Sequence, residues 1–315
     1  MPEIQIISPG ALTSVQDLGR PGHRRHGVAA GGAMDPFALR MANLLVGNDE
    51  NAAALEFALV GPRLKFSADA LIALCGGEFG ELQAWRPVYV RAGEEISLEK
   101  NRSGCRGYLA VAGGIDVTMV LGGRGTDLRG GFGGHEGRAL RAGDVLKTKE
   151  APAPKVNIEA ALHHFISPKI RPAYASSPVV RVVRGAETAE FFLGRFYSEP
   201  FAVDSRSDRM GVRLAGPKLE RFGGVGELIS SSVAPGTIQV PRDGQPIVLM
   251  ADAQTLGGYP KIAHVISVDL PLVAQLRPGD KVNFQNITVE AARDLWRTRE
   301  RDIALLREGL RGKLI

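Results

Sequence analysis

The sequence predicts a mainly β chain of two β-barrel-like lobes, with a few short helices and a C-terminal amphipathic helix. The 315 residues include 39 glycines and 19 prolines, which favours many turns between short strands, and the 44% hydrophobic content is enough for two cores. Short apolar runs between glycine turns recur in both halves. The phrase Arg-x-Gly-Asp precedes a strand-like run at 141–144 and again at 277–280, which hints at two related lobes.

The N-terminal β-rich lobe is predicted to span residues 1–150. Residues 2–16 alternate between apolar and polar side chains as a strand does, and the apolar runs between 54 and 146 indicate a meander of strands. The following segment, 151–178, is rich in proline and uneven in composition, so it is predicted to be a linker.

The C-terminal β-barrel lobe is predicted to span residues 179–315. It opens on the strand-like run VVRVVRG, continues through a predicted helix at 187–197, and then returns to alternating strands and turns. From residue 288 onward apolar residues recur at helical spacing with charges between them, so a charged amphipathic helix is expected to close the chain.

A short helix is predicted within GGAMDPFALRMANLLVGN, residues 31–48. Asp35 can cap its first turn, Pro36 suits the first helical position, and Gly47 can supply a left-handed stop. The apolar side chains form one stripe, and Asn43 points about 145° away from its centre. Asn43 is interpreted as a solvent-exposed residue, with a ligand contact as the alternative.

Charge and composition limit the classes of function. The formal net charge of +5 is not gathered into a basic block, which favours small anionic ligands over nucleic acid. Cys75 and Cys105 lack CxxC spacing and are expected to be buried, reduced thiols. The histidines lack companions at zinc-binding spacing, so no metal site is predicted. No apolar run is long enough to span a membrane, and a cytoplasmic location is expected.

Two loops resemble catalytic motifs without matching them. The glycine-rich run 121–138 has neither GxxxxGK[ST] nor GxGxxG spacing, so a structural loop is favoured over a phosphate cradle. The run SSSVAPG, 230–236, lacks the GxSxG elbow and is interpreted as a loop.

The phrase ADAQTLGGYPKIA, 251–263, is the most ligand-like loop of the chain. Gln254 and Thr255 offer polar side chains, while Gly257 and Gly258 permit close backbone approach or positive φ, and Tyr259 precedes a proline. The alternative is a tight hairpin turn with incidental polar residues.

Several long phrases together resemble the KipA-like family, also called allophanate hydrolase subunit 2 or the 5-oxoprolinase C subunit. They are VQDLGRPG, GGAMDPFALRMANLLVGN, LRGGFGGHEGRAL, SDRMGVRLAGP and APGTIQVPRDGQPIVLMADAQTLGGYPKIA, and the likeness runs from about residue 13 to residue 283. The same module is similar to half of the carboxyltransferase domain of urea carboxylase. Two phrases depart from the family pattern: GGRGT stands at 122–126 in place of GSRST, and QTLGGYP at 254–260 in place of QTTGGYP.

The resemblance implies cyclophilin-like β-barrel architecture and a site for a planar N–C=O group. Donors at the carbonyl oxygen would stabilise negative charge that develops there. The catalytic candidates are Asn43 and Lys261 as donors, and Asp252 as acceptor of the amide N–H or as a partner that orients Lys261. Arg209 is the candidate fork for a substrate carboxylate or for phosphate oxygens, with Asp208 as a weaker candidate beside it. The remaining substrate-binding candidates are Gln254, Thr255, Gly257, Gly258 and Tyr259.

The function implied first is that of an ATP-dependent 5-oxoprolinase subunit. Its partners would be a KipI-like subunit (the 5-oxoprolinase B subunit) and a LamB/YcsF-type subunit, and ATP would be shared with the partner subunit. The alternatives are a biotin-dependent carboxyltransferase subunit that receives carboxybiotin from another chain, and a non-enzymatic regulator of a kinase inhibitor. Neither nucleic acid nor a membrane is expected as a partner.

Overall fold

The computed structural model describes residues 2–149, 162–222 and 228–314, with the backbone alone described for 311–314. The chain divides into two compact units. Unit 1 comprises Met1–Pro21, Gly31–Arg171 and Arg301–Ile315, and unit 2 comprises Gly22–Ala30 and Pro172–Glu300. The boundaries expected at 150 and 178 stay a prediction, because residues 151–161 of the expected linker lie outside the described residues.

Unit 1 is built on two antiparallel sheets whose facing sides form its core. A four-stranded sheet has the order β7-β4-β1-β9 and a five-stranded sheet the order β2-β3-β8-β5-β6. The predicted strand at 2–16 is broken in the middle, where Gly10 has a φ of 67°. Core side chains come from both sheets, among them Ile4 and Leu64 from the first and Leu55 and Leu109 from the second. The strands are β1 (Glu3–Ser8), β2 (Leu12–Gln16), β3 (Ala54–Ala58), β4 (Arg63–Phe66), β5 (Ala70–Phe79), β6 (Pro87–Val90), β7 (Glu95–Ser97), β8 (Asn101–Val111) and β9 (Val145–Lys147).

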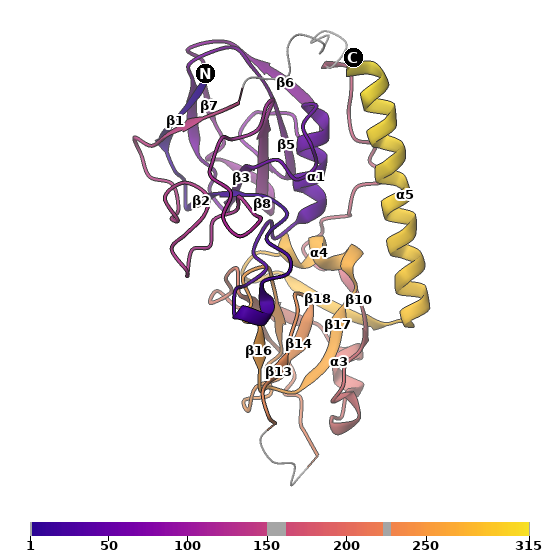
Figure 1. Cartoon of the computed structure of the whole chain (residues 1–315). Coiled ribbons are helices and arrows are strands. Elements are labelled where there is room, and N and C mark those ends of the chain that lie inside the picture. Colours follow the sequence, from indigo (N-terminus) through magenta and orange to yellow (C-terminus); the bar gives the residue numbers. More distant parts are fainter. Residues whose placement is uncertain (1, 150–161, 223–227, 315) are drawn as a thin grey trace. The chain divides into compact units, whose positions relative to one another are not determined.

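Helix α1 (Pro36–Leu45) packs against β5 and β8 of the five-stranded sheet (Figure 1). Its predicted boundaries are confirmed: the Asp35 side chain accepts a hydrogen bond from Ala38 N at 2.9 Å, and Gly47 has a φ of 76°. The hydroxyl of Tyr108 ties the helix start to the sheet, because it accepts from Asp35 N and donates to Glu56, each at 2.8 Å. Burial raises the pKa of Tyr108, so this hydroxyl keeps its proton.

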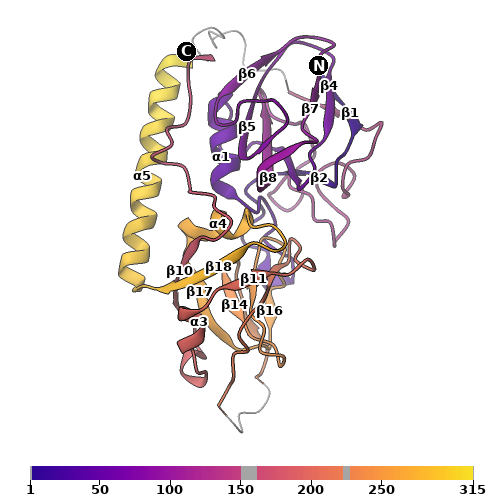
Figure 2. The same ribbon diagram turned by 180° about the vertical axis from the view of Figure 1, so that it is seen from behind.

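Unit 2 is a closed barrel with the strand order β10-β17-β14-β15-β12-β11-β18. A separate two-stranded sheet pairs β13 with β16, and helix α3 (Gly194–Ser198) packs on β18 (Figure 2). The mainly β fold with a barrel, short helices and a terminal helix is therefore confirmed. The strands are β10 (Val179–Arg184), β11 (Phe201–Val203), β12 (Gly211–Ala215), β13 (Ser231–Ser232), β14 (Thr237–Gln239), β15 (Ile247–Leu249), β16 (Leu256–Gly257), β17 (Lys261–Val265) and β18 (Lys281–Asn286).

The Arg-x-Gly-Asp phrase forms the same turn in both units. The carboxylates of Asp144 and Asp280 accept from the backbone N–H of Arg141 and Arg277, each at 2.8 Å. The glycine before each aspartate has a φ of 90°. Each turn also exchanges backbone hydrogen bonds with a strand of its own unit, at Ile6 in unit 1 and at Val203 in unit 2. The short sequence echo therefore corresponds to a repeated local structure.

The predicted helix at 187–197 is two short pieces, the 3-10 turn η2 (Thr188–Glu190) and α3. Between them Phe191 is extended, with φ −130° and ψ 149°, because it forms a β-bridge with Arg221. The terminal helix is present as α5 (Val289–Leu314). Other short helices are η1 (Arg24–His26), η3 (Ser267–Asp269) and α4 (Leu270–Ala274).

The two cysteines are free and buried, as expected, and burial raises the pKa of the Cys75 thiol well above its ordinary value. In the part of the chain that the structure describes, none of the helices is both long and apolar enough to cross a membrane.

The glycine-rich run 121–138 packs around the side chain of Arg20. This guanidinium donates to Gly125 O and lies 4.8 Å from the centre of the Phe132 ring. A Cβ on Gly133 would come within 2.9 Å of Arg20 Nη2, so close packing explains that glycine. These contacts show that the run packs against Arg20 as a structural loop does.

Candidate functional site

Lys261, at the start of β17, is the centre of a polar cluster in unit 2. Its Nζ donates to Ser231 Oγ at 2.8 Å and lies 3.6 Å from Glu187 Oε2. The backbone N–H of Lys261 donates to the same Glu187 oxygen at 2.7 Å. The side chain is only 9% exposed, and its ammonium is held between one carboxylate and one hydroxyl.

Two tight contacts fix the backbone around this cluster. A Cβ on Gly185 would collide with the Lys261 carbonyl, so the glycine allows the chain after β10 to run close to β17. A Cβ on Gly257 would lie 2.7 Å from Gln239 Nε2. The sequence suggested either close backbone approach or positive φ as the reason for a glycine at 257. The structure shows close approach, since Gly257 is not among the residues with positive φ.

The predicted ligand loop is held by a pair of glutamines. Gln239 Nε2 donates to Tyr259 O at 3.2 Å, and Gln254 Nε2 lies 3.4 Å from Gln239 Oε1. Gly257 pairs with Ser231 in the β13–β16 ribbon, so the serine run interpreted as a loop contains a two-residue strand. The structure thus brings Gln254, Gly257 and Lys261 together around Gln239 and Ser231.

Arg209 and Asp252 form a buried, bidentate ion pair. Nε and Nη2 of the arginine donate to the two carboxylate oxygens at 2.7 and 2.9 Å, and the residues are 5% and 7% exposed. The neighbouring Asp208 instead accepts from the N–H groups of Met210 and Gly211. Because Asp252 occupies the fork of Arg209, binding of a substrate carboxylate there would require an exchange of partners.

Asn43 lies in unit 1 and is fully buried, so its interpretation as a solvent-exposed residue is wrong. Its Nδ2 donates to Ala52 O at 2.8 Å, and its Oδ1 accepts from Asn48 Nδ2 at 3.0 Å. Asn48 in turn donates to Val111 O and accepts from Gly113 N. The Asn43 amide thus holds the loop that follows α1, and its role as a catalytic donor stays a prediction.

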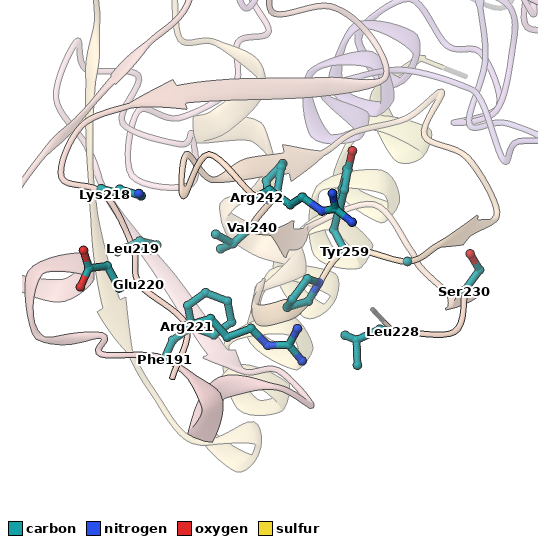
Figure 3. A pocket seen from close by; sticks show the side chains of 13 residues that line it. Phe191, Lys218, Leu219, Glu220, Arg221, Leu228, Ser230, Val240, Arg242 and Tyr259 are labelled. Atoms are coloured by element: carbon teal, nitrogen blue, oxygen red, sulfur yellow. The ribbon is translucent and has the colours of Figure 1, made fainter. Parts of the chain in front are cut away.

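A cavity of about 850 Å³ opens beside the ligand loop in unit 2 (Figure 3). Ser230, Gly258 and Tyr259 line one part of it, and Tyr259 is 49% exposed. Arg221 and Arg242 are among the other lining residues. Ser230 is the neighbour in sequence of Ser231, which contacts Lys261, so the cavity and the Lys261 cluster share this segment.

His264 lies on the same strand as Lys261, and its imidazole is neutral at pH 7. Burial first, and the charge of Lys261 second, lower the pKa of its imidazole. Its Nδ1 lies 3.2 Å from Thr237 Oγ1, which is consistent with a neutral ring in the barrel wall.

Sequence reasoning missed four residues of this site: Glu187, Ser231, Arg221 and Arg242. Glu187 lies 74 positions before Lys261, and no motif connects the two. The Ser230–Ser232 run attracts attention in the sequence only as a possible nucleophile. The spacing of the two arginines gives no signal, because the pairing of distant loops places them on one cavity.

Comparison with known proteins identifies the family of this chain. The family described as "Carboxyltransferase domain, subdomain A and B" matches residues 26–286. The C subunit of the 5-oxoprolinase of Escherichia coli (strain K12) is 40% identical over 299 residues, which cover 92% of this chain and 93% of that protein. The corresponding protein of Haemophilus influenzae is 38% identical over 309 residues, covering 94% and 95%.

A solved structure shares the fold. The urea amidolyase of K. lactis superposes with a TM-score of 0.88 at 32% identity, covering 96% of this chain and 20% of that one. The counterpart of this chain is therefore one segment of a much longer fungal enzyme. The sequence resemblance is confirmed: the chain belongs to the carboxyltransferase domain family, subdomains A and B, and to the group of 5-oxoprolinase C subunits and urea carboxylase relatives within it.

Proposed function

We propose that this chain is a subunit of an ATP-dependent 5-oxoprolinase, which opens the lactam of 5-oxoproline to give glutamate. The observation that carries the proposal is the extent of the match. The chain corresponds to 93% and 95% of two 5-oxoprolinase C subunits, but to only 20% of the urea amidolyase with the same fold. ATP would supply the activation of the lactam, and the residues of this chain would bind and orient it.

The chemistry of the Lys261 cluster suits a planar amide. A lactam presents one oxygen that needs donors and one N–H that needs an acceptor. Lys261 Nζ is a charged donor at the start of a barrel strand, and the charge of Glu187 keeps the ammonium in place. The backbone of Gly257 and Gly258 and the amide of Gln254 lie on the same loop and supply further polar groups. Asn43, Asp252, Arg209, Thr255 and Tyr259 remain proposed members of the site.

The proposed partners are a KipI-like subunit and a LamB/YcsF-type subunit. Two relatives are themselves named as subunits, and in the K. lactis enzyme the counterpart of this chain is fused to further sequence. Both facts support a catalytic assembly that needs more than this chain.

Reconstitution tests the proposal. The purified chain is mixed with the two partner proteins, ATP and 5-oxoproline, and glutamate release is measured. Lys261→Ala is expected to lower turnover roughly 10²–10³-fold, the usual effect of removing one donor from a developing oxyanion. Lys281→Ala, an exposed lysine of β18, is the matched control and should retain activity. Failure of the complete mixture to release glutamate would refute the function, and full activity of Lys261→Ala would refute the role of Lys261.

A second candidate, biotin-dependent carboxyl transfer, is favoured by the likeness to urea amidolyase. In this reaction a carboxyl group moves from carboxybiotin to an amide nitrogen, so another chain would have to carry the biotin. Formation of allophanate from urea and carboxybiotin in the presence of the chain would support it. If the chain forms glutamate with its partners but no allophanate, the second candidate is excluded.

A further inference from the structure

We infer that the cavity of about 850 Å³ in unit 2 binds the polyphosphate chain of a nucleoside triphosphate. The inference deepens the proposed function. It rests on that function only for the identity of the nucleotide, ATP. It assigns to this chain a site that the sequence left open, since no phosphate-binding glycine motif is present.

Charge is the first reason. Three cations, Lys218, Arg221 and Arg242, line the cavity against one carboxylate, Glu220. Arg221 is paired with Glu190, whose Oε2 accepts from Arg221 Nε at 2.8 Å and lies 2.6 Å from its Nη2. With Glu190 counted beside Glu220 the charged groups around the cavity are still net positive, and the guanidinium of Arg242 suits the geometry of phosphate oxygens.

Size is the second reason. Pockets for drug-sized ligands span roughly 300–1,000 Å³. A five-membered lactam with one carboxylate would leave most of 850 Å³ empty, whereas a nucleotide with its phosphates would fill much of it. The cavity therefore suits a larger anion than the substrate proposed for the Lys261 cluster.

The walls are preorganised and partly aromatic. Phe191 and Arg221 form a β-bridge that fixes one wall, and Leu219 N donates to Gly244 O at 3.0 Å on another. A Cβ on Gly244 would come within 2.6 Å of the Lys218 side chain, which shows how closely this lysine packs on the backbone. Tyr259, which is 49% exposed, adds an aromatic ring on which a nucleobase could stack (Figure 3).

The position of the cavity beside the ligand loop is the third reason. Gly258 and Tyr259 line the cavity and belong to the loop that continues into Lys261. A bound polyphosphate and a lactam held by the Lys261 cluster would thus contact the same short segment of chain. The geometry requires no contribution from the glycine-rich run 121–138, which packs around Arg20 in the other unit.

The test is binding of ATP, tripolyphosphate and AMP to the full chain, measured by isothermal titration calorimetry at two salt concentrations. ATP and tripolyphosphate are expected to bind, AMP at least tenfold more weakly, and raised salt to weaken all three. Arg242→Ala should reduce ATP affinity at least tenfold, and Lys218→Ala should also reduce it. The matched control is Arg206→Ala in the same unit, an exposed arginine that pairs with Asp204 and should change affinity less than twofold. Circular dichroism and thermal melting check that each variant folds.

The outcomes separate the inference from the proposed function. Absence of ATP and tripolyphosphate binding, or unchanged affinity in both Arg242→Ala and Lys218→Ala, overturns the inference even if the reconstituted proteins release glutamate. Binding that depends on these residues supports it even if no glutamate is formed. Tight binding of AMP together with none of tripolyphosphate would show recognition of the base alone and would also overturn it.

Discussion

The buried pair Arg209–Asp252 gives the sharpest prediction for stability. Asp252→Ala removes two charge-assisted hydrogen bonds, of 2.7 and 2.9 Å, and leaves a guanidinium that is only 5% exposed without its carboxylate. Breaking such a buried pair from one side costs about 3–5 kcal/mol of unfolding free energy. For a unit of this size the loss corresponds to a fall in melting temperature of roughly 10–20 °C.

The measurement can be confined to unit 2. The chain has two tryptophans, Trp85 in unit 1 and Trp296 in unit 2. In a Trp85→Phe background, urea unfolding followed by the fluorescence of Trp296 reports on unit 2, which avoids fitting two units to one transition. The double variant Arg209→Met/Asp252→Leu removes both charges and is expected to be far less destabilised than Asp252→Ala.

The same variants separate structure from catalysis. Asp252→Asn retains the shape of the side chain and one acceptor oxygen. If the role of Asp252 is structural, activity should fall in proportion to stability in both the Asn and the Ala variant. A cost below about 1 kcal/mol for Asp252→Ala, the range of exposed pairs, would refute the buried bidentate geometry. Loss of turnover in a stable Asp252→Asn variant would instead identify a direct role in the reaction.

Two further predictions concern unit 1, and both can be followed by the fluorescence of Trp85. Asn43→Ala should destabilise the unit by about 1–3 kcal/mol, because the Ala52 carbonyl loses the amide that donates to it and the Asn48 amide loses one of its two acceptors; an unchanged midpoint in urea would contradict this. The Arg138 hydrogen bonds lower the pKa of Asp144 from 3.8 to about 2, so the carboxylate should stabilise the folded state at neutral pH. That contribution is present above about pH 4 and is lost as pH falls toward 2. Asp144→Asn should flatten the pH dependence of stability in this window, and equal slopes for the two proteins would refute the assignment.

Local signals in the sequence were the most reliable guide to the fold. The cap and stop residues placed α1 correctly, and the Arg-x-Gly-Asp phrase marked the same turn in both units. These features depend on hydrogen bonds between residues only a few positions apart, so the sequence shows them directly.

Long-range features could not be predicted in the same way. Helical periodicity cannot reveal that the loop after α1 covers the face that carries Asn43, which led to the wrong interpretation of this residue as exposed. The helix expected at 187–197 is interrupted because Phe191 finds a strand partner 30 residues later. Likewise the partner of Arg209 is Asp252, which lies 43 residues away in the sequence.

The sequence singled out the loop of the candidate site but not the residues that surround it. The 251–263 phrase led to Lys261, Gln254 and Gly257 only together with the family resemblance, because polar side chains beside paired glycines also fit an ordinary hairpin turn. Glu187 and the cavity arginines escaped detection, since their neighbours in sequence carry no pattern. Family resemblance identified the fold and the family to which the chain belongs.

The ribbon that presents Ser231 to Lys261 is only two residue pairs long, whereas the lysine itself belongs to the closed barrel. Opening that ribbon would release the hydroxyl and leave β17 in register. An incoming oxygen could then replace Ser231 Oγ and take over a 2.8 Å contact with an ammonium that has not moved. The Ser231 hydroxyl then occupies the place of a ligand oxygen, and separation of the β13–β16 ribbon would expose the ammonium without any rearrangement of the barrel.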